Sequence, residues 1–329
     1  MIHKFERVYV HPSQSPEQVY RDYLASFSLR QINHKFHYDS VKQSQKWLRI
    51  HERFSPSRNN PDCINAYKNC FQKAASILDN TSSWQLIGLG CGGGTKDNTL
   101  VSYLSNTEKK SIYYPVDVSL SLALIAAQKV RASYPNLSVQ PIVCDLLHAD
   151  DLIHLINKEG EADRTVITFF GMLPNFPPDQ IMPILGNFLQ KGDLLLLSAN
   201  LAPGDDYLKG IHKIFDQYDN ELTKDWLMTI LIDAGVNQEN GQIISYIEND
   251  QKTQDLKRIG VYFELRNDLN LELEDQLIQW EHGNKVQLFF SYRYNTTMIQ
   301  KILNQYSINI LDYWEAANQE EGIYLCQKQ

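Results

Sequence analysis

The stretch "LIGLGCGGGTKD", Leu86 to Asp97, contains five glycines within seven residues. It follows the short apolar run "WQLIGL" and precedes residues with helical spacing. Gly88, Gly90 and Gly93 satisfy the pattern G-x-G-x-x-G, in which glycine allows a tight turn and a close approach of the backbone to a ligand. The pattern alone is weak, because a glycine-rich turn between a strand and a helix can also bind nothing.

Apolar runs of strand length alternate with helical patterns on both sides of this loop. The predicted helices cover 63–79, 98–104, 120–134 and 181–190, and the predicted strands are "WQLIGL", "IYYPVDV", "VQPIVCDL", "RTVITFF" and "LLLLSAN". Such alternation is typical of β/α units whose mostly parallel sheet is covered on both faces.

The rest of the chain has a different pattern. Helices are predicted near 15–30 and 40–52 and across 203–236. The end of the chain is predicted to form a helix followed by two strands. Strands 258–266 and 285–294 alternate apolar and polar residues, which predicts an antiparallel pair with one face away from the core. We therefore expect a cofactor domain and an α+β substrate lobe, the first formed by 61–202 and 296–329 and the second by 1–60 and 203–295.

Composition excludes several classes of protein. The 329 residues are 43% hydrophobic and 21% charged, and the net charge is −8. An acidic chain of this kind is not expected to bind nucleic acid. The five scattered cysteines have no zinc-ligand spacing, and no signal peptide or membrane span is evident, so we expect reduced thiols, no metal, no membrane and a cytoplasmic location. The oligomeric state is not predicted.

Polar residues follow three of the predicted strands. Asp117 and Asp145 end the second and third strands, and Asn175 lies in the loop after the fourth. Open α/β sheets bind ligands at the carboxyl ends of their strands. An acid at Asp117 suits ribose hydroxyls, and one at Asp145 suits an adenine amino group, although Asp145 could also cap a helix.

Three cofactors compete for this loop. A nucleotide-phosphate loop of the type GxxxxGK[ST] is excluded, because Lys96 is followed by Asp97. A nicotinamide cofactor explains Asp117, but no convincing hydride-transfer pair is evident. S-adenosylmethionine fits better, since it has no phosphate and its ribose and adenine are held by acids. The antiparallel final strands also suit a methyltransferase sheet.

The chain resembles the ergothioneine-pathway histidine Nα-methyltransferases and their relatives, including dimethylallyltryptophan N-methyltransferases. The resemblance rests on the glycine loop with Lys96 six residues after Gly90, and on "YYPVDVSLSLA", "IVCDL", "FFGMLPNFPP" and "KFHYDS". It implies a class I methyltransferase fold with a Rossmann-like sheet and S-adenosylmethionine as cofactor. The predicted cofactor contacts are Gly88, Gly90, Cys91, Gly92, Lys96, Asp117, Asp145, Leu146, Phe170 and Gly171.

The resemblance also implies an acceptor site. Asn175 and Tyr38 match residues that face the acceptor and are our candidates for the catalytic machinery. The other predicted acceptor contacts are Phe54, Tyr218, Phe289, Ser291 and Arg293. Ser291 matches a serine of the histidine enzymes, but Phe289 replaces the glutamate that reads imidazole there, so histidine is a doubtful acceptor.

We therefore expect N-methylation of an amino acid or an amino-acid-derived small molecule. The alternatives are a non-catalytic relative, a methyltransferase for macromolecular amines and, less favoured, a nicotinamide-dependent oxidoreductase.

Overall fold

A large mixed sheet carries the glycine loop at the end of its central strand. The computed structural model describes residues 7–79, 81–104, 110–157, 162–253, 255–274 and 276–329. Within these, the strand order is β1-β5-β3-β2-β6-β7-β14-β13, with β4 beside β3. The strands are β1 (Tyr9–Val10), β2 (Ser83–Leu89), β3 (Lys110–Asp117), β4 (Ser138–Val139), β5 (Ile142–Val143), β6 (Arg164–Phe170), β7 (Leu194–Asn200), β13 (Ile308–Glu315) and β14 (Glu321–Lys328).

The strands from β1 to β7 pair in parallel, whereas β14 runs antiparallel to β7 and to β13. Helices cover both faces of the sheet. Successive residues of the central strand point to opposite sides, so Leu86 packs with α4, α5 and α6, and Ile87 packs with α7, α8 and α11. These helices are α4 (Pro61–Leu78), α5 (Thr95–Leu104), α6 (Leu120–Ser133), α7 (Leu152–Asn157), α8 (Pro178–Phe188) and α11 (Thr296–Asn304). The predicted Rossmann-like α/β fold is confirmed.

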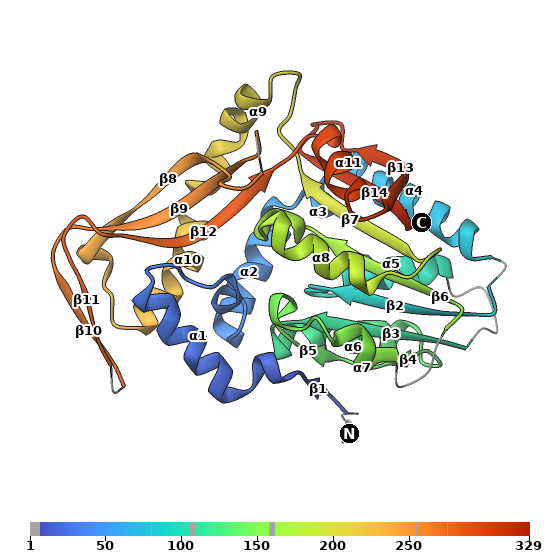
Figure 1. The fold of residues 1–329 in the computed structure, drawn as a ribbon, viewed down its shortest axis with the longest axis horizontal. Helices are drawn as coiled ribbons and strands as arrows, with labels where there is room; N and C mark the ends of the chain where they lie inside the picture. The colour runs from blue at the N-terminus through green and yellow to red at the C-terminus, as the bar shows by residue number, and fades with distance from the viewer. Residues whose placement is uncertain (1–6, 80, 105–109, 158–161, 254, 275) are drawn as a thin grey trace.

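A second, antiparallel sheet in the order β12-β9-β8 lies apart from the first (Figure 1). Its strands are β8 (Gly241–Asn249), β9 (Lys257–Leu265) and β12 (Lys285–Arg293), and a hairpin of β10 (Leu269–Leu273) and β11 (Gln276–Trp280) joins β9 to β12. Helices α1 (Pro16–Ser28), α2 (Val41–Phe54), α9 (Tyr207–Ile214) and α10 (Glu221–Asp233) accompany it, and the short α3 (Pro56–Asn59) leads into α4. A separate hydrophobic core, containing Phe27 and Trp280, holds these elements together.

Two strand predictions were wrong. The single strand predicted over "VQPIVCDL" is the two short strands β4 and β5, because Pro141 between them has no N–H for the ladder. The predicted open face of β12 is also wrong, since every residue from Val286 to Arg293 is buried. Its second face is covered by the N-terminal segment and α10 and borders a cavity, and β8, β10 and β11 were not predicted.

Hydrogen bonds at Asn200 fix the place where the two sheets meet. The amide of Tyr294 donates to the carbonyl of Asn200, and the amide of Ala202 donates to the carbonyl of Tyr294, each at 2.9–3.0 Å. The chain therefore leaves the large sheet after β7 and returns beside the same point at the end of β12. The N-terminal strand β1 forms one edge of the large sheet, where it pairs with β5. None of the helices in the described part of the chain is both long and apolar enough to cross a membrane.

Candidate active site

A cavity of about 960 Å³ lies where the carboxyl ends of the parallel strands face β12 and the N-terminal helices. It brings together nearly all of the residues predicted from the sequence. Those that line it are Gly90, Cys91, Gly92, Lys96, Asp117, Asp145, Leu146, Phe170 and Gly171 from the predicted cofactor set, and Tyr38, Phe54, Asn175, Tyr218, Phe289, Ser291 and Arg293 from the predicted acceptor set.

Gly88 is the predicted contact that does not line the cavity. A β-carbon at Gly88 would lie 2.2 Å from Oδ2 of Asp97, whose carboxylate accepts hydrogen bonds from the hydroxyls of Tyr113 (2.6 Å) and Thr168 (2.8 Å). Gly88 thus makes room for a buried carboxylate beneath the loop. This arrangement fixes the start of α5 behind the glycines.

The glycine loop itself has the conformation that its composition allows. Gly90, Gly92 and Gly94 have positive φ, the region that residues with a β-carbon rarely adopt. A β-carbon at Gly94 would also lie 2.6 Å from Cα of Ala126 in α6. The indole ring of Trp47, from α2, packs over Gly92 on the other side. The loop is therefore pressed between α6 and α2.

Asp117 is positioned by the loop. Its carboxylate accepts hydrogen bonds from the backbone amides of Gly92 and Ser119, both at 2.9 Å. Burial raises the pKa of Asp117 to about 6, and these amides oppose the rise. A buried carboxylate beside a glycine loop at the end of the second main strand fits the ribose of the predicted cofactor.

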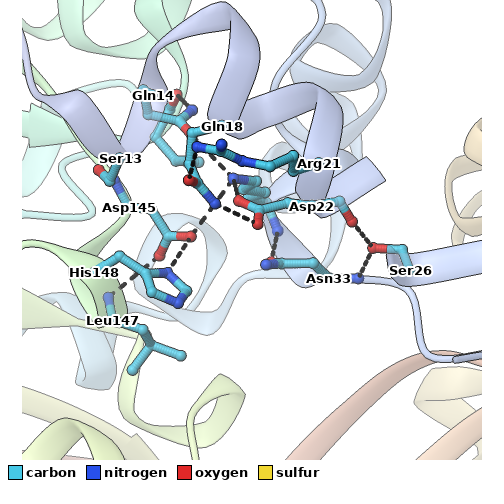
Figure 2. Close-up of polar contacts among 12 residues, drawn as sticks. Ser13, Gln14, Gln18, Arg21, Asp22, Ser26, Asn33, Asp145, Leu147 and His148 are labelled. Carbon is cyan, nitrogen blue, oxygen red and sulfur yellow. Dashed lines mark hydrogen bonds and ion pairs between the residues drawn. The ribbon is translucent and has the colours of Figure 1, made fainter. Parts of the chain in front are cut away.

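Asp145 belongs to a larger polar network at the far side of the cavity. Figure 2 shows its carboxylate beside His148 and near Asp22 of α1. The ammonium of Lys35 lies 2.5 Å from Asp22 and 3.7 Å from Asp145, and its side chain is only 3% exposed. Burial tends to raise the pKa of Asp145, but the hydrogen bond from His148 and the charge of Lys35 hold it below its usual value. Hydrogen bonds and ion pairs thus connect this side of the cavity to the N-terminal segment.

Gln14 and Ser13 make further hydrogen bonds that hold the N-terminal segment against the cavity. The Gln14 side chain accepts from Lys35 at 3.2 Å and donates to the carbonyl of Val118 at 3.0 Å, next to Asp117. The hydroxyl of Ser13 accepts from the amide of Asp145 at 2.9 Å (Figure 2). Residues 9–35 therefore close the cavity beside both acids.

Lys96 projects from the first turn of α5 into a cluster that the sequence did not reveal. Its ammonium donates to the hydroxyl of Tyr67 at 2.7 Å, lies 3.6 Å from Glu321, and faces the rings of Tyr67 and Phe170 at 4.3 and 5.6 Å. The Tyr67 hydroxyl also donates to Glu321 and lies 2.8 Å from the hydroxyl of Ser198. Glu321 itself lines the cavity.

Aromatic rings line the part of the cavity that holds the predicted acceptor contacts, here called the acceptor side. Phe289 stacks on His34 with ring centroids 4.6 Å apart and an interplanar angle of 18°, and Trp226 packs on Phe289 at 5.7 Å. Burial and the nearby charges of His37 and Arg258 lower the pKa of His34 to about 3, so this imidazole is uncharged at neutral pH. Asn175 ends the short turn η4 (Leu173–Asn175) and contributes to the same wall.

Tyr38 and Phe54 lie at different depths. The ring of Tyr38 packs edge-on against Trp47 and Trp226 at 5.8 and 5.4 Å. Burial and, to a lesser extent, the nearby carboxylate of Asp117 raise the pKa of Tyr38. Phe54, at the end of α2, is 50% exposed and lies at the cavity rim.

Arg293 is the buried cation of the acceptor side. Its side chain comes from the end of β12, the residue is 3% exposed, and it donates to the hydroxyl of Tyr218 at 2.6 Å. Its Nε has no hydrogen-bond partner, and no carboxylate among the described residues lies within ion-pair distance. Ser291, two residues earlier, is buried on the same wall. A buried guanidinium without an anion fits a site that receives one.

Two charged residues at the end of β9 and just after it lie away from this cavity. Glu264 and Arg266 line a separate small hollow with His282, and Glu264 pairs with Lys285 on the outer surface. The described residues contain no cluster of three or more His, Cys, Asp or Glu side chains suited to a metal ion. All five cysteines are free.

Known proteins share sequence similarity with this chain. The sequence model of the family described as "Histidine-specific methyltransferase, SAM-dependent" matches residues 21–328. The chain is 22% identical over 280 residues to N-methyltransferase imqF of Aspergillus flavus, a match that covers 83% of this chain and 73% of that one. It is also 22% identical over 220 residues to histidine N-alpha-methyltransferase of Mycolicibacterium smegmatis, with 64% and 63% covered.

Among solved structures, the chain is similar to magnesium protoporphyrin IX methyltransferase of Synechocystis with bound S-adenosylhomocysteine. The sequence identity is 13%, the TM-score is 0.47, and the match covers 90% of this chain and 98% of that one.

Proposed function

Because the chain belongs to the family of histidine-specific, S-adenosylmethionine-dependent methyltransferases, we propose that its acceptor is an amino acid, or a close derivative, with an uncharged aromatic side chain and a free carboxylate. The cofactor assignment leaves no role for the nicotinamide alternative. We further propose that 61–202 and 296–329 bind the cofactor, and that 1–60 and 203–295 select the acceptor.

Arg293 is the observation that carries this proposal. A buried guanidinium without an anionic partner is costly, and a carboxylate on the ligand would offset that cost through charge-assisted hydrogen bonds. The Tyr218 hydroxyl fixes its orientation. An α-amino acid supplies such a carboxylate next to the amine that is to be methylated.

The neighbouring rings support an aromatic side chain. Phe289, His34 and Trp226 present flat, uncharged surfaces, and the neutral imidazole of His34 adds no charge. Phe289 cannot accept a hydrogen bond from the N–H of an imidazole side chain, whereas a glutamate at this position could. The pocket therefore favours apolar rings over histidine.

S-adenosylmethionine, when bound, supplies an electrophilic methyl group, and its transfer to a neutral amine leaves S-adenosylhomocysteine and one released proton. The protein's part is to hold the amine in the reactive orientation and to keep water out. Asn175 can accept a hydrogen bond from the amine through its side-chain carbonyl. Asp117, Asp145 and Lys96 would hold the cofactor, and Tyr38 lines the same cavity.

A panel of acceptors with labelled S-adenosylmethionine tests the proposal. We expect aromatic amino acids to be methylated with a higher kcat/KM than histidine, and their decarboxylated amines to react poorly. Arg293→Met should lower kcat/KM for the amino acids by roughly 30-fold or more and leave the amines unchanged. Arg266→Met removes an exposed arginine that directly follows β9 of the same sheet, and it is the matched control.

Two results would contradict the proposal. One is transfer to histidine as efficient as transfer to every aromatic amino acid. The other is equal turnover of an amino acid and its decarboxylated amine by the unmodified protein. Transfer to peptides or nucleic acids without transfer to free amino acids would instead favour a macromolecular acceptor.

A further inference from the structure

Glu321 is a buried carboxylate at the cavity wall whose role no sequence motif explains. It begins β14, is 7% exposed, and is paired across the sheet with Asn200 at the end of β7. Its carboxylate accepts hydrogen bonds from the hydroxyl of Tyr67 and from Sγ of Cys63, the latter at 3.4 Å. A carboxylate in such a position costs free energy unless it is paired or used.

Its neighbour of opposite charge is Lys96, 3.6 Å away. Lys96 lies in the first turn after the glycine loop and lines the cavity. The rings of Tyr67 and Phe170 lie beside the same spot and provide surfaces that attract ammonium groups. One cation and one anion thus stand side by side at the cavity wall.

An α-amino acid carries an ammonium and a carboxylate on one carbon, so it needs a receptor with both charges close together. We propose that Glu321 binds an α-ammonium group beside the carboxylate bound by Lys96, and that this group belongs to the methionine portion of the cofactor. The position of Lys96 directly after the glycine loop favours the cofactor, whereas the unpaired guanidinium of Arg293 is the candidate partner for the acceptor's carboxylate. This assignment does not depend on which acceptor is methylated.

The test compares two ligands that differ only in the amino group. S-adenosylhomocysteine and its deaminated analogue, in which the α-amino group is replaced by hydrogen, are titrated calorimetrically without an acceptor. We expect the unmodified protein to bind S-adenosylhomocysteine roughly 10- to 100-fold more tightly than the analogue. Glu321→Gln should lose most of this ratio, through weaker binding of S-adenosylhomocysteine and unchanged binding of the analogue.

Glu320→Gln is the matched control. Glu320 adjoins Glu321, but its carboxylate accepts from the side chain of Gln217 instead of facing Lys96, so its removal should leave the ratio unchanged. Lys96→Met is the complementary variant, and it should weaken both ligands while preserving the preference for the amino group.

Three outcomes would overturn the proposal. Equal binding of both ligands by the unmodified protein excludes an ammonium site, whether or not any variant folds. An equal loss of both ligands in Glu321→Gln makes Glu321 only the counter-ion that positions Lys96. Unchanged binding of both ligands with a raised KM for the acceptor assigns Glu321 to the acceptor's amine.

Discussion

The ionisation state of Asp117 sets the pH range over which we expect the cofactor to bind well. Its carboxylate has a pKa of about 6, raised by burial from 3.8. Only the ionised form can accept hydrogen bonds through both oxygens from ribose hydroxyls while it accepts from Gly92 and Ser119. Affinity for S-adenosylhomocysteine should therefore rise with pH up to about 6 and then level off, with at most about a tenfold change per pH unit below 6.

Calorimetric titration at pH 5, 6 and 7.5 measures this dependence. Asp117→Asn is the control, because an amide does not titrate, and its weaker binding should change little over the same range. If the unmodified protein bound equally well at pH 5 and 7.5, Asp117 would not be the ribose acid.

Some residues of the cavity could be identified from the sequence, and others could not. Asp117 and Asp145 were predicted because each ends a strand pattern in the sequence, and parallel strands align their ends. In the structure Asp117 is the last residue of β3, and Asp145 lies two residues after β5. Lys35 and Glu321 were not, although both line the same cavity, because they lie 110 and 176 residues from Asp145 along the chain and follow no motif. Their place depends on tertiary packing, which periodicity does not report.

The glycine loop is an element whose shape we expect to resist substitution at particular positions. At Gly94 the positive φ and the backbone of Ala126, 2.6 Å from the place that a β-carbon would occupy, both oppose alanine. At Gly93, φ is ordinary and the nearest atom, in the Leu48 side chain, is 3.5 Å away. We expect Gly94→Ala to lower the free energy of unfolding by about 1–3 kcal/mol and to weaken S-adenosylhomocysteine binding.

Gly93→Ala is the adjacent control and should change the free energy of unfolding by less than about 0.5 kcal/mol. Urea unfolding monitored by tryptophan fluorescence compares the two variants. Equal effects of the two alanines would show that glycine content, and not the fixed left-handed conformation at Gly94, governs this loop.

The N-terminal segment is a second element with a specific anchor. Lys35 is the buried cation between Asp22 and Asp145, so Lys35→Met leaves two carboxylates in poorly hydrated positions. We expect a loss of about 3 kcal/mol in the free energy of unfolding, together with weaker S-adenosylhomocysteine binding at the adenine end. Adding Asp22→Asn should restore part of the stability, since it removes one unpaired charge.

Lys42→Met provides the comparison, because Lys42 pairs with Asp233 in an exposed ion pair of the same lobe. Its loss should cost less than about 1 kcal/mol. A Lys35 variant as stable as the Lys42 variant would mean that the network in Figure 2 is not an anchor.

Elements of the large sheet were predictable because buried parallel strands are continuous apolar runs. "RTVITFF" and "LLLLSAN" became β6 and β7 with the expected boundaries. The lobe was harder to predict. The alternating pattern of β12 indicated a one-sided strand, but its polar face, which carries Ser291 and Arg293, is buried against the cavity. Polar residues that line a cavity give the same alternation of apolar and polar residues as a strand with one face in solvent.

Three histidines between the two sheets should make the stability of the whole molecule depend on pH. Burial lowers the pKa of His34 and His51 to about 3 and that of His37 to about 4, all from 6.5. His37 is fully buried, with Nε2 donating to the carbonyl of Leu288 at 2.7 Å and Nδ1 without a partner. A second proton on His37 would find no acceptor.

The direction of this pH dependence follows from the number of protons that the folded and unfolded states bind. As pH falls below 6.5 the unfolded chain protonates these imidazoles while the folded chain does not, so stability present above pH 6.5 is lost toward pH 4. His37 alone should contribute up to about 1.4 kcal/mol per pH unit in this interval. Asp117 acts in the opposite direction between pH 6 and 3.8, because its folded form takes up a proton first, and it offsets about one of the three histidines. Burial also raises the pKa values of Asp39, Asp97 and Asp193, which act in the same direction as Asp117.

Urea unfolding at pH 7 and pH 5 tests the balance, and we expect a lower free energy of unfolding at pH 5. His37→Gln keeps an N–H donor for the Leu288 carbonyl but cannot titrate, so the difference between the two pH values should shrink by the share of His37. A pH dependence that is equal in His37→Gln and in the unmodified protein would show that His37 is already protonated at pH 5 in the folded protein. In that case the acceptor wall beside His34 would carry a positive charge, and the proposed preference for uncharged aromatic rings would lose one of its supports.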